Sequence, residues 1–380
     1  MPSDARRERL GLQRKSPVKH DLIEPVTTST GPELPPDSTE TPCFVIFEER
    51  VRHNLRKTAE ACGGMDRLMP HLKTHRASWI VELLLSQGVR AFKAATVAEV
   101  EMAVGAGAPH VTWAYPTASR ANIARFVSFA RKHRSTTFVG AVDSFAALEI
   151  WETLLTGADG NISLRVDLDP GLGRTGMPMS EVALSLARAV HACRRLAGWH
   201  VYDGHVKGSY AERRAQVGEL CAKVRRLGDV LRSEGIETDV VAGGSYTFDI
   251  WPADVAAHVS PGSWTYSSAQ HDVELAHLGW QPAAFVLASV VSARSGTLTL
   301  DAGCKAIAPD KPLVDRFRWN GRVLLMNEEH TVVEGDNLSV GDRVLLIPQH
   351  ACTTAYLYDS ALVKTIDGRW ERRPQMGSAR

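Results

Sequence analysis

The chain has 380 residues, of which 44% are hydrophobic and 23% charged, and its formal net charge is +1 at pH 7. Its basic residues are spread along the sequence, which argues against a nucleic-acid partner, and no apolar run approaches the roughly 20 residues that cross a bilayer. We therefore expect a globular protein with one large and one smaller domain, without a nucleic-acid or membrane partner.

The first segment, residues 1–40, is rich in Pro, Ser, Thr and charged residues and lacks apolar periodicity. This composition predicts a disordered N-terminal tail. The acidic residues Asp4, Glu8 and Asp21 argue against a transit peptide. Six cysteines without a secretory leader indicate free thiols in a reducing compartment, so we expect a cytoplasmic protein.

After this tail, short apolar strands alternate with amphipathic helices. The pattern predicts strands at 43–47, 67–72, 91–94, 111–113, 137–142, 162–167, 199–202, 238–241 and 257–259. Helices are predicted at 49–61 and 78–87 and between most of the later strands. Eight strand and helix units over about 220 residues predict an α/β domain, a parallel (β/α)8 TIM-type barrel, over residues 41–275.

The last part of the chain has a different pattern. Strands are predicted at 285–293, 297–300, 322–325, 331–334, 343–347 and 361–366, and they are separated by short turns. We expect a smaller C-terminal all-β domain over residues 276–380. The barrel would carry its chemistry where its strands end, because that edge collects the loops of all strands.

The end of the predicted strand 67–72 carries Lys73 between His71 and His75, with Arg76 close by. A lysine crowded by other cationic or titratable groups can have a depressed pKa, and a neutral amine attacks an aldehyde to form a Schiff base. The alternative is an ordinary surface lysine that happens to have histidines beside it.

Two turns that follow predicted strands suit the binding of a phosphate. The first contains Gly243, Gly244, Ser245 and Thr247, and the second contains Gly262 and Ser263. Glycines let backbone N–H groups approach an anion, and hydroxyl groups add further donors. Late loops of a barrel commonly bind phosphate in this way, although either turn alone could be a plain loop.

Other polar residues also lie at predicted strand ends. Arg174 belongs to a glycine-rich turn, and Tyr202 and His205 follow the strand 199–202. The arginine could instead cap a neighbouring carboxylate, and the tyrosine and histidine could form a core hydrogen-bond network. Because parallel strands end at the same edge of a barrel, these side chains and Lys73 can converge on one site.

A candidate metal site lies near the end of the chain, at His350 and Cys352. On an extended strand, residues two apart project to the same face, so an imidazole and a thiolate could bind one borderline-soft divalent metal. The alternative is a partly buried histidine beside an inert core cysteine, since a metal site needs more than two ligands.

Together these motifs carry a resemblance. Three motifs resemble those of the D-threonine aldolase and D-serine dehydratase family and follow one another in the same order as in that family. They are Pro70-His71-Leu72-Lys73-Thr74-His75, the segment Lys93 to Glu99 and the closing His350-x-Cys352. These are pyridoxal phosphate enzymes of the alanine racemase fold type, and the similarity covers residues 41–367. A departure is found at Tyr266 to His271, where many aldolase-like members carry a Trp-Asp and Gly-Tyr pair, so the substrate side chain stays open.

The resemblance implies roles for the candidate residues. Lys73 would hold pyridoxal 5'-phosphate as a Schiff base, Arg174 would approach the phenolic oxygen of the cofactor, and Tyr202 and His205 would lie beside its pyridine ring. The two glycine-rich turns would hold the phosphate. His350 and Cys352 would bind one divalent ion (zinc, manganese or magnesium) that acts on a substrate hydroxyl.

The implied activity is that of a lyase for small D-β-hydroxy-α-amino acids, and we expect a homodimer. We favour retro-aldol cleavage to glycine and an aldehyde, as in a D-threonine aldolase. The alternative is a dehydratase for D-serine or D-3-hydroxyaspartate that gives a keto acid and ammonia. More remote alternatives are an amino-acid racemase and a non-catalytic protein that binds pyridoxal phosphate.

Overall fold

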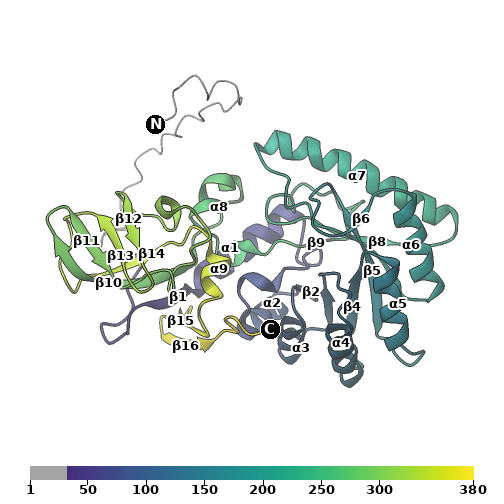
Figure 1. Ribbon diagram of the computed structural model, residues 1–380, viewed down its shortest axis with the longest axis horizontal. Helices are drawn as coiled ribbons and strands as arrows, with labels where there is room; N and C mark the ends of the chain where they lie inside the picture. Colours follow the sequence, from purple (N-terminus) through teal and green to yellow (C-terminus); the bar gives the residue numbers. More distant parts are fainter. Residues whose placement is uncertain (1–31) are drawn as a thin grey trace, which may run out of the picture. The chain divides into compact units, whose positions relative to one another are not determined.

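The computed structural model describes residues 32–380, which form two sheets with helices between and around their strands (Figure 1). The helices are α1 (Glu48–Cys62), α2 (Ser78–Ser86), α3 (Val97–Gly105), α4 (Arg120–Lys132), α5 (Phe145–Leu154), α6 (Glu181–Ala192), α7 (Tyr210–Ser233), α8 (Ala269–Glu274) and α9 (Ala351–Ala355). Short 3-10 turns lie at Leu72–Thr74, Ser263–Thr265, Ala276–Leu278 and Leu313–Asp315.

The first sheet is parallel and curls into a barrel. Its strands are β2 (Ala91–Ala94), β3 (His110–Trp113), β4 (Thr137–Val142), β5 (Ile162–Asp169), β7 (Leu196–Val201), β8 (Asp239–Ala242) and β9 (His258–Val259), with the two-residue β6 (Met177–Pro178) paired to β5. An extended segment, residues 67–71, closes the ring, because Leu68 pairs with Val259 of β9 and His71 pairs with Lys93 of β2. The predicted (β/α)8 barrel is confirmed, and residues 67–71, just before Lys73, form the first of its eight extended segments.

Amphipathic helices cover the outside of this barrel (Figure 1). In α4, for example, the side chains of Ile123, Phe126, Val127 and Ala130 are buried, which is the spacing of one helix face. The helix begins at a serine, Ser119, whose hydroxyl accepts a hydrogen bond from a backbone N–H of the first turn. The helices therefore pack their apolar faces on the strands and leave the strand ends free to carry loops.

The second sheet contains the predicted C-terminal strands. Its strand order is β12-β13-β11-β10-β1-β15-β16, and β14 also pairs with β10. The bounds are β10 (Ala284–Arg294), β11 (Thr297–Leu300), β12 (Val323–Met326), β13 (Thr331–Glu334), β14 (Arg343–Leu346), β15 (Ser360–Lys364) and β16 (Trp370–Pro374). All six predicted strands of this domain are found, and β16 is an addition to them.

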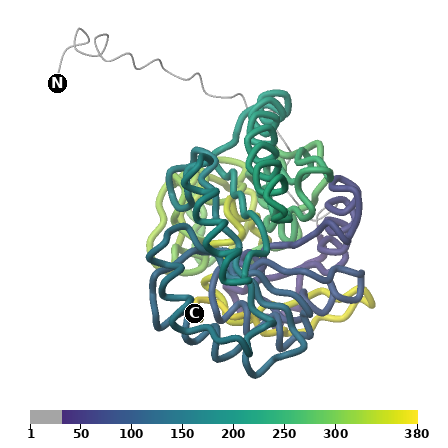
Figure 2. The backbone as a smooth tube through the Cα atoms, turned by 90° about the vertical axis from the view of Figure 1, so that its right-hand side faces the viewer, coloured from purple at the N-terminus to yellow at the C-terminus, as the bar shows by residue number. Residues whose placement is uncertain are grey.

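One predicted barrel strand belongs to the second sheet. Strand β1 (Cys43–Phe47) pairs antiparallel with β10 and parallel with β15, so its assignment to the barrel is wrong. All five of its residues are buried, and a strand buried on both faces has the same sequence pattern in either sheet. In both views β1, in purple, lies beside the yellow C-terminal strands (Figures 1 and 2).

Residues before β1 are partly held in place. Arg343 of β14 donates hydrogen bonds of 2.9 Å to the carbonyl oxygens of Pro35 and Pro36 and also contacts Asp37. The predicted disorder of residues 1–40 falls largely outside the described residues, and within them the chain is already fixed before residue 40.

Within residues 32–380, no helix combines the length and the apolar composition that a bilayer-crossing helix needs.

Packing inside the barrel gives a first test of the fold. Gly140 of β4 faces Trp151 of α5, and a Cβ at this position would lie 2.6 Å from the indole ring. Gly140→Ala should therefore lower the free energy of unfolding by about 1–3 kcal/mol, measured by denaturant titration. Gly157→Ala is the control, because a Cβ there meets nothing within 4 Å. Equal stability of the two variants would contradict this packing.

Candidate active site

The lysine turn follows directly from the segment that closes the barrel. Residues 67–71 run beside β9 and β2, and Leu72–Thr74 then forms a 3-10 turn. His71 caps this turn, because its Nδ1 accepts a hydrogen bond of 3.3 Å from the backbone N–H of Lys73. Lys73 thus lies just after the carboxyl end of the first extended segment of the barrel, as the sequence predicts.

The groups around Lys73 are not the cationic neighbours that the sequence led us to expect. His71 and His75 both turn a ring nitrogen toward backbone N–H groups near the turn. Burial has the largest influence and lowers the pKa of Lys73, but Tyr115, Tyr202 and a nearby thiol raise it, and the pKa ends above its ordinary value. The expected depression of this pKa is therefore wrong, because phenols and a thiol face the amine.

The ring of Tyr202 lies at the centre of a group of cations. Its centroid is 4.8 Å from the guanidinium carbon of Arg174, 5.6 Å from Lys73 Nζ and 5.7 Å from Lys93 Nζ. Arg174 also lies 5.6 Å over the ring of Tyr115. The structure brings the predicted residues Lys73, Arg174 and Tyr202 together and adds two others. Tyr115 follows strand β3 closely, so the strand-end rule could have found it.

The turn after β7 orients its neighbours through Asp203. The Asp203 carboxylate accepts hydrogen bonds of 2.8 Å from the hydroxyl of Thr247 and the indole N–H of Trp251. Burial raises the pKa of Asp203, although these hydrogen bonds oppose the rise. His205 is exposed and is not among the residues that line the pocket described below, and its place beside the cofactor ring stays a prediction.

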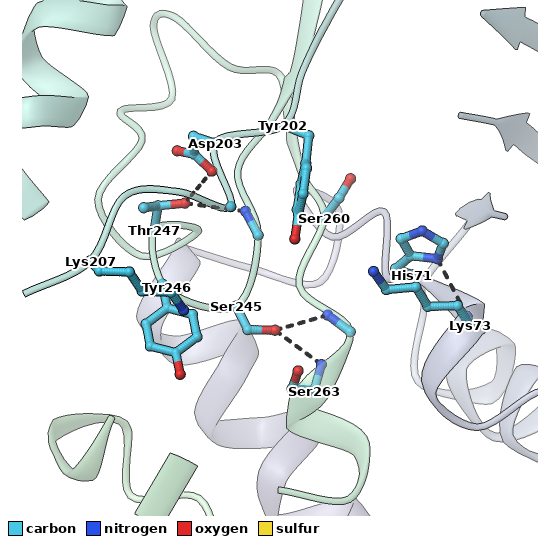
Figure 3. A pocket seen from close by; sticks show the side chains of 13 residues that line it. His71, Lys73, Tyr202, Asp203, Lys207, Ser245, Tyr246, Thr247, Ser260 and Ser263 are labelled. Atoms are coloured by element: carbon cyan, nitrogen blue, oxygen red, sulfur yellow. Dashed lines mark hydrogen bonds between the residues drawn. The ribbon is translucent and has the colours of Figure 1, made fainter. Parts of the chain in front are cut away.

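The two predicted phosphate loops meet. The Ser245 hydroxyl oxygen accepts hydrogen bonds from the backbone N–H groups of Ser263 at 3.0 Å and Gly262 at 3.4 Å (Figure 3). The N–H of Gly244 donates to the Thr247 hydroxyl at 3.1 Å. A Cβ on Gly262 would lie 3.2 Å from a carbonyl oxygen of the lysine turn, so glycine allows this loop to approach closely.

Between the lysine turn and these loops lies a pocket of about 100 Å³. Its lining comprises His71, Lys73, Tyr202, Asp203, Gly204, Lys207, Gly244, Ser245, Tyr246, Thr247, Ser260, Gly262 and Ser263. Lys73 extends from one side, and Ser245 and Ser263 lie across from it (Figure 3). Gly243, with a φ of 76°, shapes the turn from outside this lining.

Two polar atoms in this pocket fit a bound anion. Among residues 32–380, the Ser260 hydroxyl and the His71 Nε2 are buried without a hydrogen-bond partner. Such atoms are usually completed by water or a ligand. The site therefore offers hydroxyl and N–H donors for a phosphate on one side and an amine for an aldehyde on the other, which fits the donor set that pyridoxal phosphate needs.

The predicted metal ligands lie at the start of a helix. His350 is the N-cap of α9 and Cys352 lies in its first turn, so the expected extended strand is wrong. The two side chains still lie close together: burial raises the pKa of the Cys352 thiol, but His350, Thr74 and Lys73 together lower it below its ordinary value. Cys352 Sγ lies 3.2 Å from the Thr74 hydroxyl, next to Lys73.

A carboxylate that the sequence did not indicate orients the His350 ring. Asp310 Oδ2 lies 2.5 Å from His350 Nδ1. Metal-binding histidines commonly have a carboxylate at the ring nitrogen that does not bind the metal, where it fixes the orientation of the ring. Over residues 32–380, no three His, Cys, Asp or Glu side chains gather as a closed metal site. His350 and Cys352 together fit an open site, in which water or substrate completes the coordination.

Family models match most of the described chain. The model "Alanine racemase, N-terminal domain" matches residues 46–270, and the model "Putative serine dehydratase domain" matches residues 283–364. The first match spans the barrel and the second spans most of the antiparallel sheet.

Individual proteins are similar over nearly their whole length. The chain is 26% identical to a 3-hydroxy-D-aspartate aldolase of Paracoccus denitrificans (86% of this chain, 89% of that protein) and 26% identical to a D-threonine aldolase of an Arthrobacter species (87% and 92%). A solved D-threo-3-hydroxyaspartate dehydratase of Delftia sp. HT23 superposes with a TM-score of 0.79 at 19% identity (89% and 98%). A mutant of that dehydratase is described in a metal-free form.

The phosphate loops can be tested by one substitution. In Ser245→Asp, the new carboxylate can accept the same two backbone N–H groups, so the fold should persist, but it repels an anion. Affinity for inorganic phosphate and for pyridoxal phosphate should fall at least about tenfold in titrations of the apoprotein. Ser245→Asn is the uncharged control and should lose less. Wild-type affinity in the aspartate variant would mean that these turns are plain loops.

Proposed function

The chain belongs to the family of the alanine racemase N-terminal domain, and we propose that it cleaves D-β-hydroxy-α-amino acids to glycine and an aldehyde. It is a pyridoxal phosphate-dependent lyase that uses a divalent metal, and its relatives include aldolases and a dehydratase for such substrates. The two aldolases reported above support the aldol reaction.

One contact carries the proposal. Cys352 lies beside Thr74, which adjoins Lys73, so a metal held by His350 and Cys352 would share the site of the lysine. A barrel protein that only bound the cofactor would not need such a pair. A racemase would need a second base facing the lysine, whereas we assign His350 and Cys352, beside the lysine turn, to a metal.

The residues that would hold the cofactor follow from the pocket. We assign the aldehyde to Lys73 and the phosphate to the donors of Gly244, Ser245, Gly262 and Ser263. Thr247 holds Gly244 in place. Arg174 would lie by the phenolic oxygen and Tyr202 against the ring, where a cation and a flat surface suit an electron-poor aromatic ligand.

When bound, pyridoxal phosphate supplies the electron sink that allows a bond at Cα to break. Lys73 Nζ is the group that we assign to carry a proton to or from Cα. In the aldol route the β-hydroxyl loses its proton, the Cα–Cβ bond breaks and Cα receives a proton, which gives glycine and an aldehyde. His350 and Cys352 would hold the metal, which would supply a Lewis acid for the β-hydroxyl, and Asp310 fixes the ring of His350.

Elimination is the second candidate. Here Lys73 Nζ takes the Cα proton, the β-hydroxyl leaves as hydroxide, and the product hydrolyses to a keto acid and ammonia. The thiol of Cys352 favours this route, because a closing His-x-Cys resembles the metal-binding pattern of the dehydratases in this family. Both routes use the same residues and differ in which bond of Cα breaks.

We further propose a homodimer in the cytoplasm. All six cysteines lie within the described residues and are free, which suits a reducing compartment.

Product analysis tests the reaction and the metal together. With D-threonine, the wild type should give glycine and acetaldehyde, and chelation should stop turnover until a divalent metal is restored. His350→Ala should lower turnover at least about 100-fold without loss of bound cofactor, since one remaining ligand cannot hold the ion. His330→Ala, in an exposed turn, is the control. Keto acid in place of glycine would assign the dehydratase, and full activity without metal would refute the metal role.

The assignment of Lys73 as the cofactor-binding lysine can be tested by identifying the labelled peptide. Reduction of the loaded wild type with borohydride should fix the cofactor on the peptide that contains Lys73, identified by mass spectrometry. Lys73→Ala should lose the visible absorbance of lysine-bound cofactor. Lys93 is a second amine near the same ring. A label on Lys93 of the wild type would contradict the assignment.

A further inference from the structure

Lys93 is a lysine inside the barrel. It lies on strand β2 with only 2% of its surface exposed, and its Nζ lies 5.7 Å from the centroid of the Tyr202 ring. Among residues 32–380, its ammonium makes no hydrogen bond and lies within 4.0 Å of no carboxylate. An unpaired ammonium at such depth is costly, so a lysine here needs an explanation that packing does not give.

The nearby carboxylates are already engaged. Asp167 of β5 accepts hydrogen bonds from His200 at 2.5 Å and from Thr175 at 3.0 Å. Asp203 after β7 accepts its two from a hydroxyl and an indole N–H. These carboxylates therefore act on Lys93 only at a distance.

The remaining neighbours are cationic or neutral. Lys73 from the lysine turn and Arg174 from the loop after β5 both lower the pKa of Lys93, and the neutral rings of His71 and His200 lie close enough to feel its charge. Burial has the largest influence, and the pKa falls to about 7. Near pH 8 the amine of the cofactor-free protein is thus mostly neutral.

We propose that Lys93 is a cofactor-binding residue, the buried counter-charge for the anionic phenolic side of bound pyridoxal phosphate. The inference rests on the proposed function. Lys93 of β2 and Arg174 of the loop after β5 both lie near the ring of Tyr202, which lines the pocket, so an anion bound beside this ring would be attracted by two cations. An anion bound there raises the proton affinity of the Lys93 amine, which takes one proton from solvent as the cofactor enters: R–NH2 plus H⁺ gives R–NH3⁺.

Proton uptake is the decisive measurement. Cofactor binding to the apoprotein is followed by calorimetry at pH 8, in two buffers of different ionisation enthalpy, for the wild type and Lys93→Met. The wild type should take up close to one proton more than the variant, and the variant should bind the cofactor about tenfold more weakly. Lys132→Met, at the exposed end of α4, should match the wild type.

The same variants separate binding from folding. Methionine fills the buried position without the free-energy cost of burying an unpaired ammonium group. The melting temperature of the Lys93→Met apoprotein should therefore not fall. Lys93→Gln repeats the test should the methionine variant not fold. Wild-type affinity and wild-type proton uptake in these variants would overturn the proposal and leave Lys93 as a core residue. Failure of the wild type itself to bind the cofactor would instead refute the proposed function.

Discussion

The closure of the barrel by residues 67–71 is the constraint on which the site depends. This segment pairs with β9 through Leu68 and with β2 through His71, so its direction is fixed from both sides. The lysine turn can then leave the barrel in one direction only. The loop after β9, which carries Gly262, runs directly beside it, and a Cβ on Gly262 would make tight contacts of 3.0–3.2 Å with Thr74 and His71. An amine and an anion-binding loop that are far apart in sequence thereby face one pocket.

The proposed metal ligands, His350 and Cys352, come to the lysine turn from the second domain. Strand β1 precedes the barrel in the chain but pairs with β10 and β15, which follow it. The chain therefore enters and leaves the barrel through one sheet, and the start of α9 lies against the lysine turn, where Cys352 contacts Thr74. The chemistry proposed here needs both domains, because the barrel supplies the amine and the second domain supplies the metal ligands.

The top of the barrel is more polar than its stability requires. Asp167 and His200 bond to each other below the pocket, and Arg165 pairs with Asp239 deeper in the barrel. Burial of such groups seldom stabilises a fold relative to apolar side chains. Lys93, which lacks even a paired carboxylate, is the strongest example. Buried polar residues such as Asp167, His200 and Lys93 are expected where function, and not packing, decides the residue.

The sequence by itself determined most of the elements, and its resemblance to a known family indicated the chemistry. Periodicity predicted the barrel strands and the C-terminal strands closely, because each is a short apolar run bounded by turn residues. The positions of Lys73, Arg174, Tyr202 and Ser245 at strand ends followed from the barrel rule alone. These inferences depend on local pattern, which a single sequence contains.

The tertiary structure decided what depends on distant partners. It placed β1 in the second sheet, since a strand buried on both faces does not encode which strands flank it. It reversed the expected pKa shift of Lys73, because the groups around that amine come from other strands. It also brought Asp310 to His350 and placed Lys93 beside Tyr202. Electrostatic environment is a property of neighbours in space, and those neighbours exist only once the chain has folded.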